Sequence, residues 1–253
     1  MSGVALLSPG RRIAVLGAAG GIGRSLVDAC LAHGCEVAAL DLPASLAGWT
    51  PPSGVRTFAV DATDEASVKA AFAGLAEAFD GLDGFVNLAG FTAAREPLAE
   101  MDLATFEEVT SGNLRSAFLS ARAALPLLRR GEAPAMVLVS SGLALKPTPG
   151  YGPYSAAKAG VLALTRLLAQ ENAPLIRVNA VAPGAVETPF LTGGTGRSAR
   201  ESNFEREAYV RQVPLARMAR PGDVTGPIMF LLGPASAYIT GQTLHVNGGL
   251  LMV

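Results

Sequence analysis

The sequence predicts a single doubly wound α/β domain over residues 1–253, in which helices cover both faces of a seven-stranded parallel sheet. Strand-like runs alternate with longer helix-like segments, which favours parallel strands joined by right-handed crossovers. These runs are apolar nearly throughout, as in strands that are buried on both faces. Half of the 253 residues are apolar and 16% are charged, which is enough for one large core.

Seven runs have strand character and five segments have helix character. The predicted strands with their exits are 12–17, 35–41, 55–61, 84–90, 135–141, 176–184 and 242–249. The predicted helices are 22–33, 64–79, 102–130, 153–172 and 221–232. Asp64 and Asp223 stand where N-cap or first-turn residues are expected.

The segment 186–211 interrupts this alternation. It is polar, rich in Gly, Ser and Arg, and follows a predicted strand at the side of the sheet where ligands bind in such folds. Because a long excursion from a compact domain is usually a mobile functional loop, we expect a substrate lid here.

Composition excludes several classes of partner. The net charge of −1 creates no field that would attract nucleic acid or an anionic membrane. No uncharged apolar segment approaches the ~20 residues that span a bilayer, and the N-terminal basic residues follow the apolar run, the reverse of a secretory signal. Cys30, His33 and Cys35 fit no zinc-binding spacing, so we expect reduced thiols and no metal. We predict a cytoplasmic protein that acts on a small molecule.

Three glycines mark the turn between the first predicted strand and the first predicted helix. Gly17, Gly21 and Gly23 occur in VLGAAGGIGRSL, after an apolar strand and at the start of an amphipathic helix. Glycines there let the backbone approach a pyrophosphate, which the free N–H groups and the dipole of the helix N-terminus attract. The alternative is an ordinary tight turn.

Asp41 ends the second predicted strand, 24 residues after Gly17. A carboxylate at this point can accept hydrogen bonds from both ribose hydroxyls of NAD and would repel the additional phosphate of NADP. We therefore predict NAD(H) as the cofactor. The alternative is a solvated aspartate that begins a turn.

A tyrosine and a lysine lie four residues apart at the start of a largely apolar helix. Only three lysines occur in the chain, and Lys158 follows Tyr154 in YGPYSAAK. Residues at this spacing share one helix face, about 6 Å apart along the axis, whereas Tyr151 precedes the expected helix start. A buried ammonium, together with a positively charged nicotinamide, would lower the pKa of Tyr154 and make it an acid or base near neutral pH. The alternative is a surface pair.

Two further residues strengthen the catalytic interpretation. Ser141 ends the fifth predicted strand, 13 residues before Tyr154, where its hydroxyl can bind a substrate oxygen, and Ser140 should point to the opposite side. Asn113 lies inside a predicted helix, where asparagine has mediocre propensity, so a hydrogen bond explains it better than chance.

The motifs together resemble those of the short-chain dehydrogenase/reductase family over essentially the whole chain. The resemblance rests on Gly-x-x-x-Gly-x-Gly, the tetrad Asn113, Ser141, Tyr154 and Lys158, and the stretches NLAG (87–90) and PGAVET (183–188). It implies a Rossmann-type fold and a homotetramer. It also implies a set of residues that contact the cofactor, and this set includes Asp41 and the glycines of the turn. The predicted contacts are Gly17, Gly21, Ile22, Gly23, Asp41, Leu42, Asp61, Ala62, Asn87, Ala89, Gly90, Tyr154, Lys158, Pro183, Gly184, Val186 and Thr188.

The resemblance also assigns roles. Asn113 would position a water in a proton relay through Lys158, and the Val186 backbone would bind the nicotinamide carboxamide. Asp61 would contact the adenine, or could equally cap the helix 64–79. The positions that hold a 2′-phosphate in NADP-dependent members carry Gly20 and Leu42, neither of which is basic.

These observations predict an NAD(H)-dependent oxidoreductase that interconverts a secondary alcohol and a ketone. Segments 91–97, 142–151 and 186–211 should form the substrate pocket, with Phe91, Leu143, Tyr151 and Phe190 favouring a small apolar substrate. Two alternatives are an NADPH-dependent reductase of the 3-oxoacyl carrier-protein type and a dinucleotide-sensing regulator without turnover.

Overall fold

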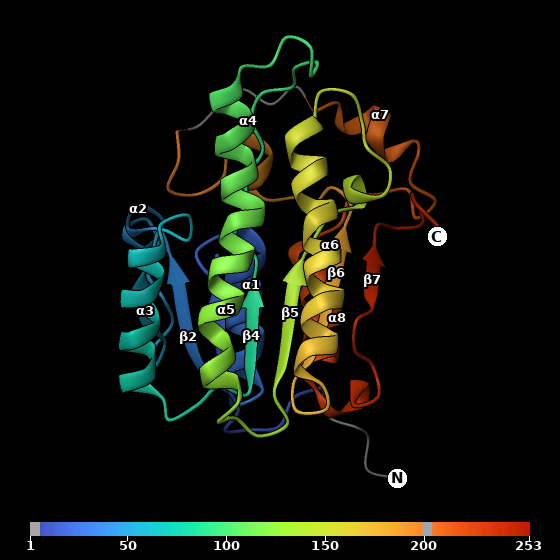
Figure 1. The fold of residues 1–253 in the computed structure, drawn as a ribbon. Helices are drawn as coiled ribbons and strands as arrows, with labels where there is room; N and C mark the ends of the chain where they lie inside the picture. Colours follow the sequence, from blue (N-terminus) through green and yellow to red (C-terminus); the bar gives the residue numbers. More distant parts are fainter. Residues whose placement is uncertain (1–5, 199–203) are drawn as a thin grey trace.

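A seven-stranded, wholly parallel sheet forms the centre of the protein, as the sequence predicts. The computed structural model describes residues 6–198 and 204–253. The sheet has the order β3-β2-β1-β4-β5-β6-β7, and every neighbouring pair is parallel (Figure 1). The strands are β1 (Arg12–Leu16), β2 (Glu36–Asp41), β3 (Arg56–Ala59), β4 (Gly84–Asn87), β5 (Ala135–Val139), β6 (Arg177–Pro183) and β7 (Thr243–Val246).

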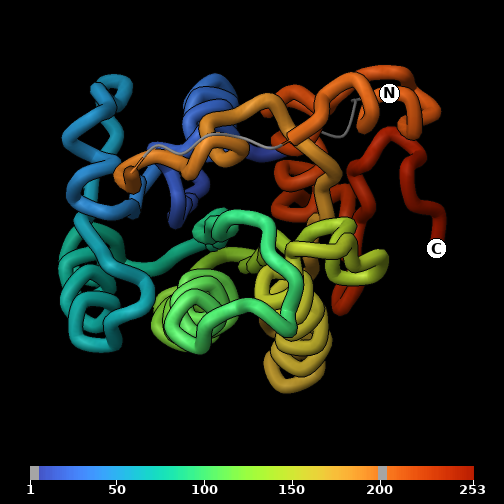
Figure 2. Tube along the Cα trace, turned by 90° about the horizontal axis from the view of Figure 1, so that it is seen from above, coloured from blue at the N-terminus to red at the C-terminus, as the bar shows by residue number. Residues whose placement is uncertain are grey.

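Helices cover both faces of this sheet. One face carries α3 (Glu65–Ala78), α5 (Ser116–Leu128) and α6 (Gly152–Asn172), and the other carries α1 (Gly21–Ala32) and α8 (Pro221–Leu232) (Figures 1 and 2). Successive residues of β1 alternate between the two cores: Ala14 and Leu16 pack on one side, Ile13 and Val15 on the other. Because both sides are dry, the strand is apolar without alternation.

The predicted helix starts are confirmed by their hydrogen bonds. Asp64 is the N-cap of α3 and accepts hydrogen bonds from the backbone N–H groups of Ala66 and Ser67. Asp223 lies in the first turn of α8, where its carboxylate accepts the N–H of Arg220 at 2.7 Å. Each bond satisfies a donor that a helix leaves free at its start.

The predicted helix 102–130 is interrupted, so the expectation of one regular helix is wrong. It consists of α4 (Leu103–Thr110), a π-helical turn (Ser111–Arg115) and α5. Such single π-turns inside α-helices are rare overall and are frequent at functional sites. Asn113 is at its centre. The sequence analysis also missed α2 (Pro43–Ala47), α7 (Arg206–Val210) and the 3₁₀ turns Gly142–Ala144, Pro189–Thr192 and Pro234–Ser236.

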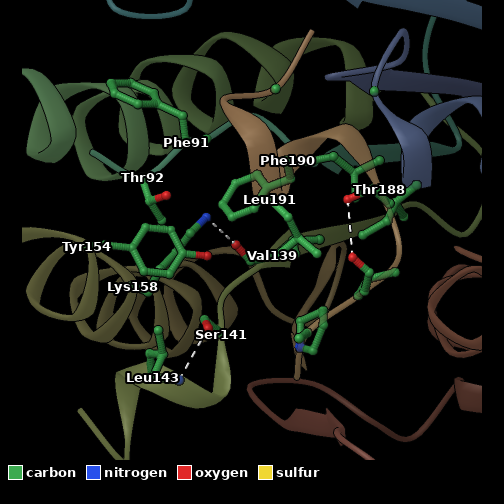
Figure 3. Close-up of a pocket in the computed structure, with 18 of the residues that line it drawn as sticks. Phe91, Thr92, Val139, Ser141, Leu143, Tyr154, Lys158, Thr188, Phe190 and Leu191 are labelled. Atoms are coloured by element: carbon green, nitrogen blue, oxygen red, sulfur yellow. Dashed lines mark hydrogen bonds between the residues drawn. The ribbon is translucent and has the colours of Figure 1, made fainter. Parts of the chain in front are cut away.

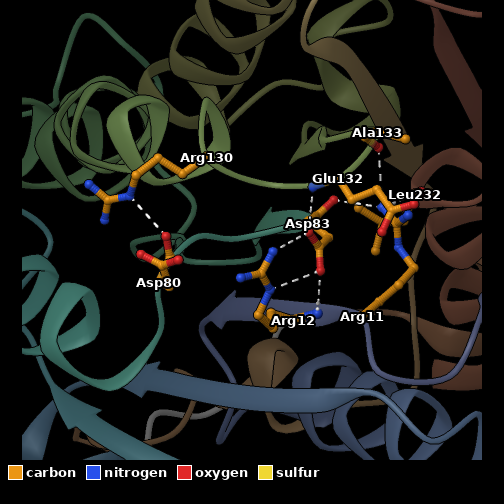
Figure 4. A network of polar contacts seen from close by, with 8 residues as sticks. All are labelled: Arg11, Arg12, Asp80, Asp83, Arg130, Glu132, Ala133 and Leu232. Carbon is orange, nitrogen blue, oxygen red and sulfur yellow. Dashed lines mark hydrogen bonds and ion pairs between the residues drawn. The ribbon is translucent and has the colours of Figure 1, made fainter.

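A polar network holds the amino ends of the central strands, opposite the ends that bear the site. Asp83 accepts four hydrogen bonds through its carboxylate, three from Arg12 and one from the N–H of Glu132, at 2.7–3.1 Å (Figure 4). Arg11 donates to the carbonyl oxygens of Asp83, Ala133 and Leu232, and so joins β4 to the last turn of α8. The network therefore ties the starts of β1 and β4 to the loop after α5 and to the last turn of α8.

The described parts of the predicted lid run across the carboxyl ends of the strands (Figure 2). Val186 forms an isolated bridge with Ala219, and the hydroxyl of Tyr209, in α7, accepts the N–H of Ala185 at 2.8 Å. Residues 199–203 of the predicted lid lie outside the described residues. No helix in the described part of the chain combines the length and the apolarity needed to cross a bilayer.

Candidate active site

A pocket of about 670 Å³ opens at the carboxyl ends of the strands. Loops that follow β1, β2, β4, β5 and β6 build its walls, as expected where ligands bind in doubly wound sheets. All but two of the predicted site residues line it. They are Gly17, Gly21, Ile22, Gly23, Asp41, Leu42, Asp61, Ala62, Ala89, Gly90, Ser141, Tyr154, Lys158, Pro183, Gly184, Val186 and Thr188.

The glycine turn forms a close-fitting cradle at one end of the pocket. Gly17 has φ +84°, and a Cβ at this position would lie 2.9 Å from the carbonyl carbon of Leu88. Gly21 touches the first part of the lid, because a Cβ there would lie 2.5 Å from Cγ2 of Thr188. The N-cap of α1 is Gly20, so no side chain caps the helix N-terminus. The uncapped N-terminus of α1 has free N–H groups, which fit a pyrophosphate.

Asp41 lies beside this cradle and is buried. Its carboxylate accepts the N–H of Ala19 at 2.9 Å and the N–H of Leu42 at 2.8 Å. Burial raises the pKa of Asp41, and hydrogen bonds from the N–H groups of Leu42 and Ala19, the hydroxyl of Ser45 and the positive charge of Arg24 oppose that shift. A carboxylate has about four lone-pair sites, so acceptor capacity remains for a ribose hydroxyl.

Asp61 lies at the exposed end of the same pocket. Its Oδ1 accepts hydrogen bonds from the N–H and the hydroxyl of Thr63. Asp64 caps α3, so the alternative that Asp61 caps this helix is wrong.

Tyr154 and Lys158 are buried neighbours in the middle of the pocket wall (Figure 3). Tyr154 is 8% exposed, Lys158 is 4% exposed, and Nζ of Lys158 lies 5.7 Å from the centroid of the Tyr154 ring. Nζ also donates a hydrogen bond to the Val139 carbonyl at 2.9 Å. The alternative of a surface pair is therefore wrong. Tyr151 precedes the first residue of α6, as predicted.

Burial dominates the ionisation of both side chains in the protein alone. It raises the pKa of Tyr154 to about 12, against the opposing effect of hydrogen bonding to Ser141. It lowers the pKa of Lys158 to about 8, so the amine still carries its proton at pH 7. In the protein by itself, burial therefore keeps the pKa of Tyr154 high. The predicted acidification needs a bound nicotinamide together with Lys158, and it stays a prediction.

Ser141 stands next to Tyr154 at the end of β5. Its hydroxyl oxygen accepts the N–H of Leu143 at 3.2 Å, which orients the side chain at the start of a 3₁₀ turn. Ser140 instead donates its hydroxyl to the carbonyl of Lys158 at 2.8 Å and so ties β5 to α6. Ser141 thus faces Tyr154, and Ser140 holds the helix that carries Lys158.

Asn87 and Asn113 do not line the pocket; they lie behind its wall. Asn113 donates to the carbonyls of Phe91 and Val109, both at 2.8 Å, which confirms that a hydrogen bond explains it. Its Oδ1 is buried with no partner among the described residues. A Cβ on Gly90 would lie 2.4 Å from this oxygen and 3.2 Å from Nζ of Lys158, so both groups approach the same point. Asn87 accepts the N–H of Ala89 at 2.8 Å and thereby shapes the loop after β4.

An apolar wall faces the Tyr154 hydroxyl. Phe91, Val109 and Tyr154 form a small cluster against which Leu143 and Phe190 pack, and the Phe190 and Tyr154 ring centroids are 6.0 Å apart. Phe91, Leu143, Tyr151 and Phe190 all line the pocket, where the sequence analysis placed them.

The sequence analysis missed three cationic side chains that line the pocket, although all occur in segments that it assigned to the pocket. Arg95, Lys146 and Arg197 all line the cavity. Arg197 stacks on Phe91, with its guanidinium carbon 3.5 Å from the ring centroid, and forms an ion pair with Glu108. The expectation of a mostly apolar pocket therefore holds beside Tyr154 but not farther out.

Comparison with known proteins decides the family. The family model described as "Enoyl-(Acyl carrier protein) reductase" matches residues 17–251. A short-chain type dehydrogenase/reductase of Sinorhizobium fredii, itself uncharacterized, is 38% identical over 251 residues. The chain belongs to the short-chain dehydrogenase/reductase family. It covers only 45% of the length of that relative, which in turn matches 98% of this chain.

Other short-chain dehydrogenases/reductases match along nearly their whole length. The 2,5-dichloro-2,5-cyclohexadiene-1,4-diol dehydrogenase of Sphingobium indicum is 33% identical, over 96% of this chain and 98% of the relative. The 3-oxoacyl-[acyl-carrier-protein] reductase of Vibrio cholerae is 31% identical with the same coverage. The crystal structure of a Brucella melitensis 3-ketoacyl-(acyl-carrier-protein) reductase complexed with NADH superposes with a TM-score of 0.87, at 27% identity, over 98% of this chain and all of that one. As a short-chain dehydrogenase/reductase, the protein is an oxidoreductase of a family that uses nicotinamide dinucleotides on small molecules.

Proposed function

We propose that this enzyme interconverts a secondary alcohol and a ketone with NAD(H) as its cofactor. One observation carries the proposal: Ser141, Tyr154 and Lys158 meet at the middle of a pocket whose far end is formed by the glycine turn and Asp41. A site for hydride exchange and a site for proton exchange would thus share one cavity.

Different side chains would bind the substrate and exchange the proton. Ser141 would hold the substrate oxygen by a hydrogen bond, and Tyr154 would exchange its phenolic proton with that oxygen. Lys158 would stabilise the phenolate and bind the nicotinamide ribose. A bound nicotinamide supplies the hydride chemistry. Gly17, Gly21 and Thr188 would hold its pyrophosphate end, and Val186 its carboxamide.

The preference for NAD rests on Asp41. Its carboxylate keeps acceptor capacity for a ribose hydroxyl, and a 2′-phosphate would add negative charge beside it. Neither Gly20 nor Leu42 supplies a cation for that phosphate. The nearby Arg24 donates to the carbonyl of Ala19 and lies over the Trp49 ring, and it is not among the residues that line the pocket.

The apolar wall formed by Phe91, Leu143 and Phe190 supports a substrate with an alicyclic or aromatic body next to the reacting carbon. The relative from Sphingobium indicum is named for a ring substrate, which supports the same choice.

A panel of secondary alcohols, assayed by NADH absorbance with NAD⁺ and with NADP⁺, tests the proposal. We expect turnover of at least one ring alcohol with NAD⁺ and much weaker turnover with NADP⁺. A protein that binds NADH but oxidises no alcohol and reduces no ketone would instead fit the dinucleotide-sensing alternative.

Asp41→Ala is expected to reduce the ratio of kcat/KM with NAD⁺ to that with NADP⁺ by about 100-fold, since repulsion of a 2′-phosphate is worth several kcal/mol. Thermal unfolding of the variant provides the control, because Asp41 also accepts the N–H of Ala19. An unchanged ratio in a folded variant would show that Asp41 does not select the cofactor.

A second candidate is reduction of a 3-oxoacyl carrier-protein thioester, which is the named activity of the Vibrio cholerae relative. A 3-oxoacyl thioester assayed in the same panel separates the two candidates. If the enzyme acts on a ring alcohol, its turnover of the thioester should be much slower than its turnover of the alcohol. The homotetrameric assembly, the single domain, the lid and the cytoplasmic location stay predictions.

A further inference from the structure

The charges in the pocket are unevenly distributed. Besides Lys158, the charged residues that line it are Asp41 and Asp61 at the dinucleotide end, and Arg95, Lys146, Arg197 and Glu205 elsewhere. The loops that carry Phe91, Leu143 and Tyr151 thus contribute Arg95 and Lys146 but no acidic lining residue.

Arg95 is an exposed side chain that contacts Tyr151 at the pocket. Its guanidinium carbon lies 4.9 Å from the centroid of the Tyr151 ring, one residue before α6 begins. The backbone N–H of Glu96 donates to the carbonyl of Gly150, and a Cβ on Gly150 would lie 3.0 Å from Cβ of Arg95. This cation–π contact holds the guanidinium against the ring, and the N–H groups of a guanidinium in such a contact can donate to a planar anion.

Lys146 is on the other of these two contacting loops, where its backbone N–H bonds to the Gly142 carbonyl at 3.0 Å. Neither Arg95 nor Lys146 forms an ion pair with any residue in 6–198 or 204–253. Arg197 differs, because Glu108 neutralises it. Two exposed cations without an ion-pair partner in the described residues therefore line the pocket.

We propose that Arg95 and Lys146 bind a carboxylate of the substrate, distal to the alcohol that reacts at Tyr154. This inference rests on the proposed function for the position of the alcohol, and it changes the substrate class from a wholly apolar alcohol to a hydroxy acid with an apolar body. The guanidinium would donate two parallel hydrogen bonds to the carboxylate and the ammonium one.

A matched pair of substrates tests this assignment. Wild-type enzyme with NAD⁺ should oxidise 4-hydroxycyclohexanecarboxylate with a kcat/KM about tenfold or more above that for its methyl ester. Arg95→Gln and Lys146→Gln should each lower the value for the acid about tenfold, through KM, and leave the ester unchanged. Lys146→Arg should retain the preference. Arg130→Gln, at the opposite end of the sheet, is the matched control.

The inference is wrong if wild type prefers the ester or if Arg95→Gln lowers both values equally. A binding measurement keeps it distinct from the proposed function. In calorimetry with NADH present, cyclohexanecarboxylate should bind wild type about tenfold or more tightly than the Arg95→Gln/Lys146→Gln variant, and less tightly as salt rises. Equal affinity, or no binding to wild type, overturns the inference even if alcohols are oxidised. Binding without any turnover would overturn only the proposed function.

Discussion

Tyr154→Phe is expected to lower kcat by about 10³-fold, the typical contribution of a positioned acid or base. The substitution removes only the hydroxyl, so the ring keeps its packing against Phe91 and Phe190. Dinucleotide affinity, measured by calorimetry, should therefore change little while turnover of the best alcohol in the panel is lost.

Tyr151→Phe is the matched control. Tyr151 also lines the pocket but precedes α6, outside the spacing that pairs Tyr154 with Lys158. We expect this variant to lose far less activity than Tyr154→Phe. If Tyr151→Phe is the more severe variant, or if Tyr154→Phe keeps wild-type kcat, the roles given to the two tyrosines are wrong.

Asp83→Ala is expected to destabilise the fold by about 3 kcal/mol and to lower Tm by roughly 6–12 °C. The substitution removes four hydrogen bonds at the amino ends of β1 and β4 and leaves the Arg12 guanidinium without its ion-pair partner (Figure 4). Thermal and denaturant unfolding measure the effect.

The same carboxylate gives the stability a pH dependence. Burial by itself would raise the pKa of Asp83, but hydrogen bonds from Arg12 and Glu132 more than offset it and hold the pKa below the usual value. A lowered folded-state pKa stabilises the protein above the unfolded-state pKa, and this stability is lost as pH falls through the folded-state value. Wild type should therefore lose more stability in acid than Asp83→Ala.

Asp80→Ala removes a nearby but exposed carboxylate and should change stability by less than about 0.5 kcal/mol. Equal losses in the two variants would mean that the network acts through general surface charge rather than through the buried contacts of Asp83.

The strands and most helices were predictable from residue type, because a strand that is buried on both faces consists almost entirely of apolar residues. Ile13, Val15 and Leu16 are apolar since both sides of β1 are packed. The turn glycines, Asp41 and the Tyr154–Lys158 pair were predictable for a related reason: each needs one residue type at one spacing.

The remaining features depend on contacts between residues that are far apart in the sequence, and the spacing of residues along the chain does not predict such contacts. The π-turn around Asn113 is a local change of backbone hydrogen bonding that the residue types do not reveal, and Asn113 donates to the carbonyl of Phe91 in the loop after β4. Arg95 and Lys146 look like ordinary surface cations in sequence, and only the contact between their loops brings them into the pocket. The raised pKa of Tyr154 depends on burial, which the pattern of the first helical turn does not show.

Titration of the Tyr154 phenol, with and without NAD⁺, tests most directly whether Lys158 and a bound nicotinamide together make Tyr154 a proton donor and acceptor. The difference in phenolate absorbance between wild type and Tyr154→Phe isolates this group from the other tyrosines. The protein alone should titrate with a pKa of about 12, and saturating NAD⁺ should lower it by several units in wild type but much less in Lys158→Met. A pKa that stays near 12 with NAD⁺ bound, or that falls equally in Lys158→Met, would contradict this account.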